Sequence, residues 1–347
     1  MSERTGKVQT VLGLTDPSEL GTTLMHEHIV GDFTPPERRP EPTPPIRMED
    51  RWQADYEWVV APGNVNLTAR DVALREMELL VEEGGRSVVE VTTPGLFLDV
   101  EGLKMIAEKT GLHIVCSTGR YTQQFMSLAD YGKTADELAK KFIREIEVGH
   151  RDTGVKAGII GEIGCSWPWT DAEKRSVQAG VITQKHTGAP LTIHPGRNAD
   201  APFDIIKLVK AEGADLTRTI MCHIERRLFT VEECLRLAEY GCVLEFDVFG
   251  SEQSRHSQNV DAGGVDLVMA SDGNRIMAIH GLIDAGHVDQ VVISQDIAQR
   301  TRQRAGGGHG YGHIYRNILP MMRRHGFTQD ELDAIMVRNP ARLLAFV

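Results

Sequence analysis

Six side chains of metal-binding type stand at the ends of short apolar segments that are spread along most of the chain. They are His26, His28, Glu162, His194, His223 and Asp296. Imidazole and carboxylate groups are ligands that zinc and related divalent ions favour. Four imidazoles and two carboxylates can hold two such ions, and two ions that share a hydroxide form a hydrolytic site. The sequence therefore predicts two divalent metal ions per chain, with Zn²⁺ preferred and Mn²⁺ or Co²⁺ as alternatives.

The spacing of these residues matches a repeating strand–helix unit. His26 and His28 are two positions apart on a predicted strand, so both point to one face, while Glu27 between them points toward the helix layer. The intervals that separate Glu162, His194 and His223 are each about one unit long, and about two units separate His223 from Asp296. The ligands would thus arrive from strands 1, 4, 5, 6 and 8, at the end where α/β barrels carry their active sites.

Each of these residues has a structural alternative when it is taken alone. A strand-end histidine such as His194 or His223 is more often a hydrogen-bonded core residue, and Asp296 could cap a helix. The pair His26 and His28 is only moderately specific for a metal. The metal interpretation is preferred because the residues fall together at the same end of several predicted strands.

Apolar runs alternate with amphipathic stretches along the chain, as is typical of a parallel sheet covered on both faces. Strands are expected at Thr23–His28, Ser87–Thr93, Leu112–Thr118, Gly158–Ile163, Pro190–His194, Arg218–His223, Cys242–Val248 and Val291–Ser294. Helices are expected at Ala69–Glu83, Glu101–Lys109, Ala135–His150, Asp171–Thr187, Pro202–Ala211, Val231–Tyr240 and Gly273–Ala285. The alternation predicts an α/β fold, a (β/α)8 TIM barrel, as a single domain over residues 1–347.

Three segments stand outside this alternation. Val8–Leu12 and Leu20–Leu24 are expected to form a short N-terminal β-hairpin that closes the bottom of the barrel. Residues 312–347 are expected to be helical, first as the last helix of the barrel and then as a C-terminal extension. Residues 34–64 are rich in proline and charge. They could link two domains, but no independent core precedes them, so a long loop after strand 1 is preferred.

The composition excludes several classes of partner. The chain has 38 basic and 49 acidic residues and a formal charge of -11, so neither nucleic acid nor an anionic membrane surface is expected to be its main partner. No apolar run has the length of a membrane span, and the N-terminus lacks an apolar leader. Five cysteines without paired spacing indicate reduced thiols. A cytoplasmic protein that acts on a small molecule is expected.

Several longer motifs resemble the phosphotriesterase family of the amidohydrolase superfamily, most closely its phosphotriesterase-related (phosphotriesterase homology) branch. The resemblance runs nearly end to end. It is carried by Gly6–Gly13, the Thr-Leu-Met-His-Glu-His stretch at 23–28, Lys156–Gly164, Gly308–Ile314 and Asn339–Arg342. The resemblance implies a metal-dependent hydrolase with a binuclear centre, and it suggests a homodimer.

The resemblance also assigns roles to the candidate ligands. His26, His28 and Asp296 would hold the more buried metal, and His194 and His223 the more exposed one. A residue of strand 4 would bridge both.

Organophosphate-degrading members use a carboxylated lysine as this bridge. Here position 161 is Gly161, and Lys156 lies at the opposite end of the strand. Glu162 therefore takes the bridging role, as in the branch without that lysine.

The expected chemistry is attack of a metal-bridging hydroxide on a carbonyl or phosphoryl centre. Asp296 would orient the hydroxide and accept its proton. The favoured substrate is a small amide or ester with an anionic group, such as an N-acyl amino acid or aminosulfonate. Lactonase or aryldialkylphosphatase-type phosphotriesterase activity is the alternative. A non-catalytic ligand-binding barrel is disfavoured because all six ligand positions are filled.

Residues on the loops after the strands are the candidates for substrate contact. They are Arg120, Tyr121, Trp167, Trp169, Arg197, Glu225, Arg226, Arg255 and His256. The tryptophans could instead pack the loop against the barrel rim, and loop arginines are often solvated. Arg226 and Arg227 in particular are expected to face solvent. The arginines favour an anionic substrate, because a guanidinium can hold an anion with two hydrogen bonds.

Overall fold

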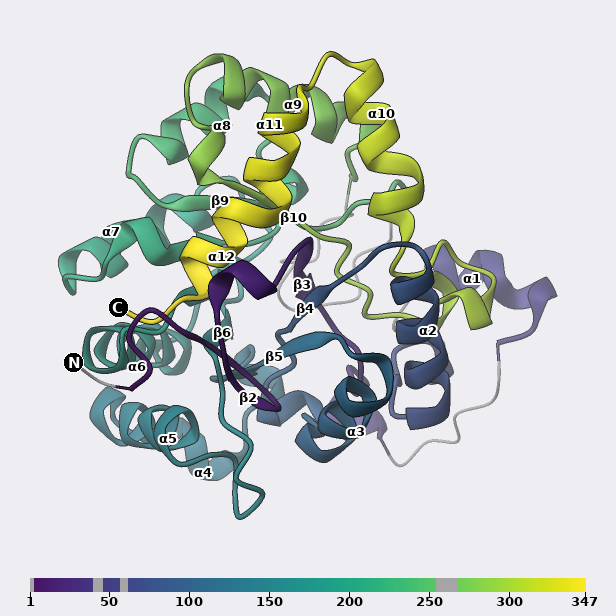
Figure 1. Ribbon diagram of the computed structural model, residues 1–347. Helices are drawn as coiled ribbons and strands as arrows, with labels where there is room; N and C mark the ends of the chain where they lie inside the picture. Colours follow the sequence, from purple (N-terminus) through teal and green to yellow (C-terminus); the bar gives the residue numbers. More distant parts are fainter. Residues whose placement is uncertain (1–2, 40–45, 57–61, 254–267) are drawn as a thin grey trace.

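The computed structural model describes residues 3–39, 46–56, 62–253 and 268–347. Eight parallel strands form a nearly closed barrel, in which each strand lies beside the next one in the chain (Figure 1). They are β3 (Thr23–Glu27), β4 (Ser87–Glu90), β5 (His113–Thr118), β6 (Ile159–Gly164), β7 (Leu191–His194), β8 (Thr219–Met221), β9 (Val243–Phe246) and β10 (Val291–Ile293). The predicted TIM-barrel fold is confirmed, with each strand found where an apolar run predicts it.

Helices surround the barrel on its outer side (Figure 1). They are α2 (Arg70–Glu82), α3 (Val100–Thr110), α4 (Leu128–Tyr131), α5 (Ala135–Glu147), α6 (Asp171–Thr187), α7 (Ala201–Ala211), α8 (Val231–Ala238) and α9 (Asp272–Asp284). Four of these helices start with a capping box, in which Thr134, Thr170, Thr230 or Ser271 is the first residue. In a capping box the hydroxyl and a side chain three residues later satisfy free backbone N–H groups. The local sequence therefore fixes where these helices begin.

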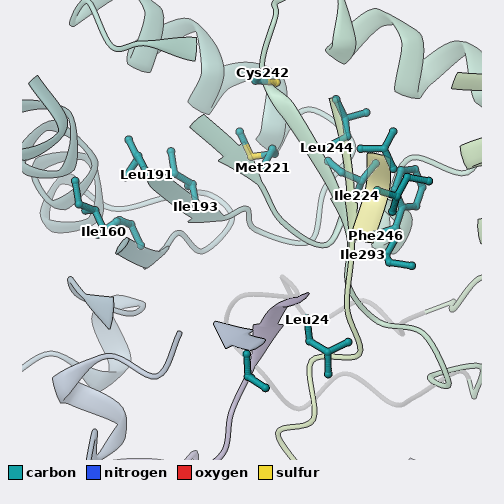
Figure 2. Packing of buried hydrophobic residues seen from close by; sticks show 14 of the residues in the cluster. Leu24, Ile160, Leu191, Ile193, Met221, Ile224, Cys242, Leu244, Phe246 and Ile293 are labelled. Carbon is teal, nitrogen blue, oxygen red and sulfur yellow. The ribbon is translucent and has the colours of Figure 1, made fainter. Parts of the chain in front are cut away.

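The core has two layers because successive strand residues face opposite sides of the sheet. Leu24, Ile160, Ile193, Leu244 and Ile293 belong to the outer layer, between strands and helices (Figure 2). Val89, Val115, Ile159, Ile220 and Val292 belong to the inner layer, inside the barrel. The inner layer fills the barrel below the candidate metal ligands, so the interior is a packed core rather than a pore.

The bottom of the barrel is closed by both ends of the chain. Val8 and Leu20 near one end, and Leu343 and Leu344 near the other, are buried in the inner core layer. The C-terminal extension comprises the π-turn η13 (Ile314–Ile318), α10 (Leu319–Arg324), α11 (Gln329–Asp333), the π-turn η14 (Ala334–Arg338) and α12 (Asn339–Leu344). The helical character predicted for this segment is confirmed. No helix among the described residues is long and apolar enough to cross a membrane.

The N-terminal hairpin differs from its prediction. β1 (Val8–Thr10) pairs with β2 (Gly13–Thr15), not with Leu20–Leu24. The turn ends at Gly13, whose φ of 126° suits glycine. Leu20 is instead fully buried below the barrel, and Leu24 lies within β3. The prediction of the second strand was wrong because it followed apolar residues, whereas the observed strand is short and partly exposed.

The segment between β3 and α2 carries short helical turns, in which α1 (Arg51–Tyr56) is the longest among the described residues. Arg51 donates hydrogen bonds to the carbonyl oxygens of Gly306 (2.8 Å) and Thr301 (2.9 Å). These bonds join the loop after the first barrel strand to the loop after the last one. The rim of the barrel is therefore held together across the seam between β3 and β10.

The buried carboxylate of Glu27 also joins the two sides of this seam through hydrogen bonds. It accepts hydrogen bonds from the Ser294 hydroxyl (2.8 Å), from the Gln295 backbone (2.9 Å) and side-chain (3.2 Å) N–H groups, and from Ile297 N–H (3.1 Å). Burial raises the pKa of Glu27 to about 7, although these donors favour the carboxylate. The residue thus ties β3 to the segment that carries Asp296.

Replacing Glu27 with alanine should lower the free energy of unfolding by about 2–4 kcal/mol, because several buried donors lose their acceptor together. Thermal or urea unfolding measures this change. The exposed Glu101 is the control, and Glu101→Ala should change the free energy of unfolding by less than about 0.5 kcal/mol. Equal stability of the two variants would show that Glu27 does not stabilise the junction between β3 and the segment after β10.

Candidate metal centre

The strand β6 departs from regular alternation where it supplies Glu162. Its register with β7 shifts between Ile160 and Ile163, and both isoleucines belong to the outer core layer. Gly161 has a φ of 103°, and a Cβ there would lie 2.0 Å from the Thr192 carbonyl oxygen. Only glycine fits this position. The irregularity turns Glu162 toward the inside of the barrel, as bulges near active sites often do.

A similar irregularity serves the histidines of β3. The register of β3 with β4 shifts between Leu24 and Glu27, and His28 follows the last strand residue. Both His26 and His28 are buried, and their Nε2 atoms lie 3.6 and 3.5 Å from oxygens of Glu162. The inward direction predicted for the pair is observed, but it depends on this shift and not on simple alternation.

The six candidate ligands come together around the two oxygens of Glu162. On one side His28 Nε2 lies 3.5 Å from Glu162 Oε1 and 3.2 Å from Asp296 Oδ1, and His26 Nε2 lies 3.7 Å from the same Asp296 oxygen. On the other side His194 Nδ1 lies 2.9 Å and His223 Nε2 lies 3.4 Å from Glu162 Oε2. His26 Nε2 also lies 3.6 Å from Glu162 Oε2, so the carboxylate of Glu162 stands in contact with donors on both sides.

The ring nitrogens that face away from the centre have partners of their own. His223 Nδ1 lies 2.6 Å from Asp247 Oδ1, and His28 Nδ1 lies 2.8 Å from the Thr92 hydroxyl. His26 Nδ1 lies 3.2 Å from Glu245 Oε2. Partners of this kind fix the orientation and tautomer of a metal-binding histidine. They leave Nε2 of each ring directed at the centre.

Sequence reasoning missed these supporting carboxylates. Glu245 and Asp247 lie on and just after β9, the strand from which no ligand is expected. They are the only charged residues in the apolar run 242–248, and they stand two positions apart. That pattern was the available signal, because two carboxylates on one face of a buried strand need partners.

Neighbouring groups keep the carboxylates of Glu162 and Asp296 ionised. Burial opposes ionisation of Glu162, but the His194 imidazole lowers the pKa below its usual value. Burial also opposes ionisation of Asp296, but the hydrogen bond from His28 and the charge of Arg226 hold the pKa well below its usual range. A metal binds the ionised form of a carboxylate.

The imidazoles complete a donor set that fits divalent ions. Burial lowers the pKa of His223 well below its usual value, which favours the neutral, metal-binding form. Burial also lowers the pKa values of His26 and His28, but Asp247 beside His26 and Asp296 beside His28 bring them above the usual value. The carboxylates that would stabilise these imidazolium ions would equally stabilise divalent cations. His26 Nε2 is buried without a hydrogen-bond partner, so it is open to a metal.

Two of the candidate ligands have unusual backbone conformations. His223 and Asp296 adopt left-handed φ values of 55° and 50°. Such conformations are costly for residues other than glycine and cluster at functional sites. His223 lies shortly after the end of β8, and Asp296 lies shortly after the end of β10. The turn of the backbone there brings each side chain over the mouth of the barrel.

A cavity of about 530 Å³, with its open mouth included, lies over the candidate ligands. It is lined by His28, Phe33, Tyr121, Glu162, His194, Arg197, His223, Arg226, Val248, Ser251, Met269, Asp296, Ala298, Gln299 and Arg302. A larger cavity near α1 contains none of the six candidate ligands. Small size, partly apolar walls and three guanidinium groups make the first cavity suitable for a small anionic molecule.

Among the residues predicted to contact substrate, Tyr121 and Arg197 line this cavity. The Tyr121 hydroxyl lies 3.5 Å from His194 Nδ1. The prediction that Arg226 faces solvent was wrong. Its Nη2 lies 2.5 Å from Asp296 Oδ2 within the cavity. The sequence alone could not place Arg226 in the cavity, because its partner Asp296 follows a strand that is distant along the chain.

Three other predicted contacts, Arg120, Trp167 and Trp169, do not line this cavity. Arg120 is buried beside α4, where its Nε lies 3.1 Å from a carboxylate oxygen of Asp130. Trp167 packs near Gly196 on the rim, and Trp169 packs against the outer core. Arg255 and His256 lie outside the described residues. Arg302, which sequence reasoning did not consider, lines the cavity instead.

The sequence matches the phosphotriesterase family over residues 6–344. It is 40% identical to the N-acetyltaurine hydrolase of Mus musculus, with 100% of both chains covered. The structure is similar to that of a resiniferatoxin-binding protein from Rhodobacter sphaeroides, with a TM-score of 0.90, 32% identity and coverage of 99% of this chain and 98% of that one. It is also similar to the phosphotriesterase homology protein of Escherichia coli, solved with phosphate in the active site, with a TM-score of 0.78, 26% identity and coverage of 95% and 100%.

Proposed function

The chain belongs to the phosphotriesterase family and is a hydrolase, and on this basis we propose that it cleaves the amide bond of a small N-acyl compound with an anionic group. The resemblance predicted from the motifs is confirmed by the family match. The proposal extends this result in two respects, namely a centre of two divalent metal ions and the chemical class of the substrate.

One observation carries the proposal of a two-metal centre. Glu162 directs Oε1 at His28, while its Oε2 lies between 2.9 and 3.6 Å from His194, His223 and His26, so the one carboxylate reaches donors of both proposed metal positions. His26, His28 and Asp296 would hold one ion, and His194 and His223 the other. When bound, two divalent ions would activate water and polarise the carbonyl group of the amide.

The side chains of the protein perform the remaining tasks. Asp296 directs Oδ1 at the centre, while Arg226 holds Oδ2 at 2.5 Å. In this position Asp296 accepts the proton of the attacking water and passes it to the leaving nitrogen. Water adds to the acyl carbon, the carbon–nitrogen bond breaks, and the products are a carboxylate and an amine. Tyr121, beside His194, forms a wall of the cavity.

Two findings support an anionic amide as the substrate. Arg197, Arg226 and Arg302 all line the small cavity, where a guanidinium can bind a carboxylate or sulfonate through two hydrogen bonds. The mouse relative is named for an N-acyl aminosulfonate, and the Escherichia coli neighbour binds phosphate in its active site. A neutral lactone or phosphotriester would gain little from these cations.

A product assay tests the substrate class. The purified enzyme is offered N-acetyltaurine and N-acetyl amino acids, simple lactones and aryl dialkyl phosphates, and the released amine or acid is measured. We expect kcat/KM for the anionic amides to exceed that for the other classes by at least about 100-fold, as is usual when a site built for a polar group meets substrates that lack it. Fast lactone hydrolysis without amide hydrolysis would overturn the proposal.

Removal of metal should abolish this activity reversibly. After chelation and dialysis we expect less than about 1% of the activity, since neither the water nor the substrate is then activated. Elemental analysis of the untreated protein should give about two divalent ions per chain. Zn²⁺, Mn²⁺ or Co²⁺ should each restore turnover, because the imidazole and carboxylate ligands suit all three. Full activity in a metal-free sample would exclude the metal centre, and metal without turnover on any substrate would favour a binding protein.

A further inference from the structure

Three arginines in the interior of this protein have a carboxylate partner. Arg226 pairs with Asp296 at 2.5 Å, Arg120 with Asp130 at 3.1 Å, and Arg275 with Asp272 at 2.6 Å. Such pairing is expected, because a guanidinium that loses water needs a compensating charge. Each of these arginines is thereby neutralised by the protein itself.

Arg302 differs from these arginines. It lines the cavity above the candidate ligands, and its guanidinium donates through Nη2 to the Ser251 hydroxyl. Within the described ranges, no carboxylate oxygen lies within 4.0 Å of it. Burial lowers the pKa of Arg302 to about 10, which reflects the cost of holding the cation there. Among the described residues, this cavity guanidinium therefore has a hydroxyl partner and no carboxylate in direct contact with it.

The backbone around Arg302 fixes its position. The Gly310 N–H donates to the Arg302 carbonyl oxygen at 2.8 Å, and a Cβ on Gly308 would lie 2.2 Å from the Arg302 carbonyl carbon. The close packing of these glycines holds the loop in one conformation. A cation that is held in place before binding loses little entropy when a ligand arrives.

We propose that Arg302 binds the anionic group of the substrate and sets the preference of the enzyme for anionic over neutral amides. The inference rests on the proposed amide hydrolysis and deepens it. Arg226 is less suited to the task because Asp296 already occupies it. Arg302 does not touch the reacting atoms, so it determines specificity and does not take part in catalysis.

The test compares two substrates of nearly equal size. One is N-acetyltaurine, and the other is its neutral analogue N-(2-methylsulfonylethyl)acetamide, in which a methyl group replaces the charged oxygen. In Arg302→Gln we expect kcat/KM for the anionic substrate to fall about 10- to 100-fold, chiefly through KM. The value for the neutral analogue should change by less than about threefold. Arg302→Lys, which keeps the charge but not the paired hydrogen bonds, should lie between wild type and Arg302→Gln.

Matched controls separate this role from general damage. Arg304→Gln removes a nearby arginine that pairs with Glu83 on the surface, and it should leave both substrates unaffected. Arg197→Gln tests the third cavity arginine, besides Arg302 and the Asp296-bound Arg226. If Arg302→Gln slowed both substrates equally, or if only Arg197→Gln lost the preference, the inference would be wrong. Equal melting temperatures of wild type and variants show that the fold is intact.

A binding measurement distinguishes failure of the inference from failure of the proposed function. Calorimetry with taurine, the product that keeps the sulfonate group, is performed on the wild-type metal-loaded enzyme and on Arg302→Gln. If the wild type hydrolyses neither amide, the proposed function fails. Taurine that binds to the wild type but at least about tenfold more weakly to Arg302→Gln would still support the anion site. Equal binding to both proteins, or binding to neither, would overturn it.

Discussion

Replacing Glu162 with glutamine should remove both metals and nearly all activity. The charge of Glu162 faces four imidazoles at distances between 2.9 and 3.6 Å. Loss of a residue that only supports a ligand lowers metal affinity or activity by about 10- to 100-fold, so loss of the shared ligand should exceed 100-fold. Glutamine keeps the shape of the side chain but offers one oxygen and no charge. Metal analysis and kcat/KM on the preferred substrate measure the effect.

Glu101→Gln on the surface of α3 is the matched control for this experiment and should retain metal and rate. A Glu162→Gln protein with two metals per chain and unimpaired turnover would show that Glu162 does not bridge the centre. A protein that keeps one metal would assign Glu162 to a single site.

Replacing Asp296 with asparagine should affect the rate more than the metal content. Asparagine keeps an oxygen in the place of Oδ1, 3.2 Å from His28 Nε2, so much of the bound metal should remain. It cannot accept a proton, and we expect kcat to fall by about 10²- to 10⁴-fold, as for loss of a general base. KM should change little, because the proposed role of Asp296 concerns the reacting water and not the anionic group.

The kinetic measurement needs metal analysis of the same sample. Low activity with near-normal metal supports proton transfer by Asp296. Low activity with lost metal would indicate that Asp296 acts only as a metal ligand. Wild-type turnover with full metal would contradict both roles. Asp330→Asn, on the exposed start of α11, serves as the control.

The barrel could be predicted from sequence because its signals are strong and repeated. Each strand is a short apolar run, and capping residues such as Thr134 and Thr170 mark the helix starts. The hairpin was mispredicted because its second strand, Gly13–Thr15, has almost no apolar signal. Sequence patterns report burial, and a three-residue strand at the surface buries little.

The candidate site, too, could be predicted from the sequence only in part. The six candidate ligands could be named from their type and place at strand ends. The supporting residues could not, because their roles depend on neighbours that are distant in sequence. Arg226 was expected to be solvated, and only the position of Asp296 shows otherwise. Arg302 belongs to a turn after β10 that has no distinctive motif, and its place in the cavity comes from the fold alone.

The distribution of the candidate ligands along the chain determines when the protein could acquire the proposed ions. His26 lies on the first barrel strand, and Asp296 follows the last one. The two residues nevertheless meet, because the Asp296 N–H donates to the His26 carbonyl oxygen at 3.3 Å. A nascent polypeptide on the ribosome cannot present the complete set until nearly all strands have been synthesised and have assembled. Ions that bind only the finished barrel stabilise it by mass action. Ion retention and resistance to unfolding should therefore rise and fall together.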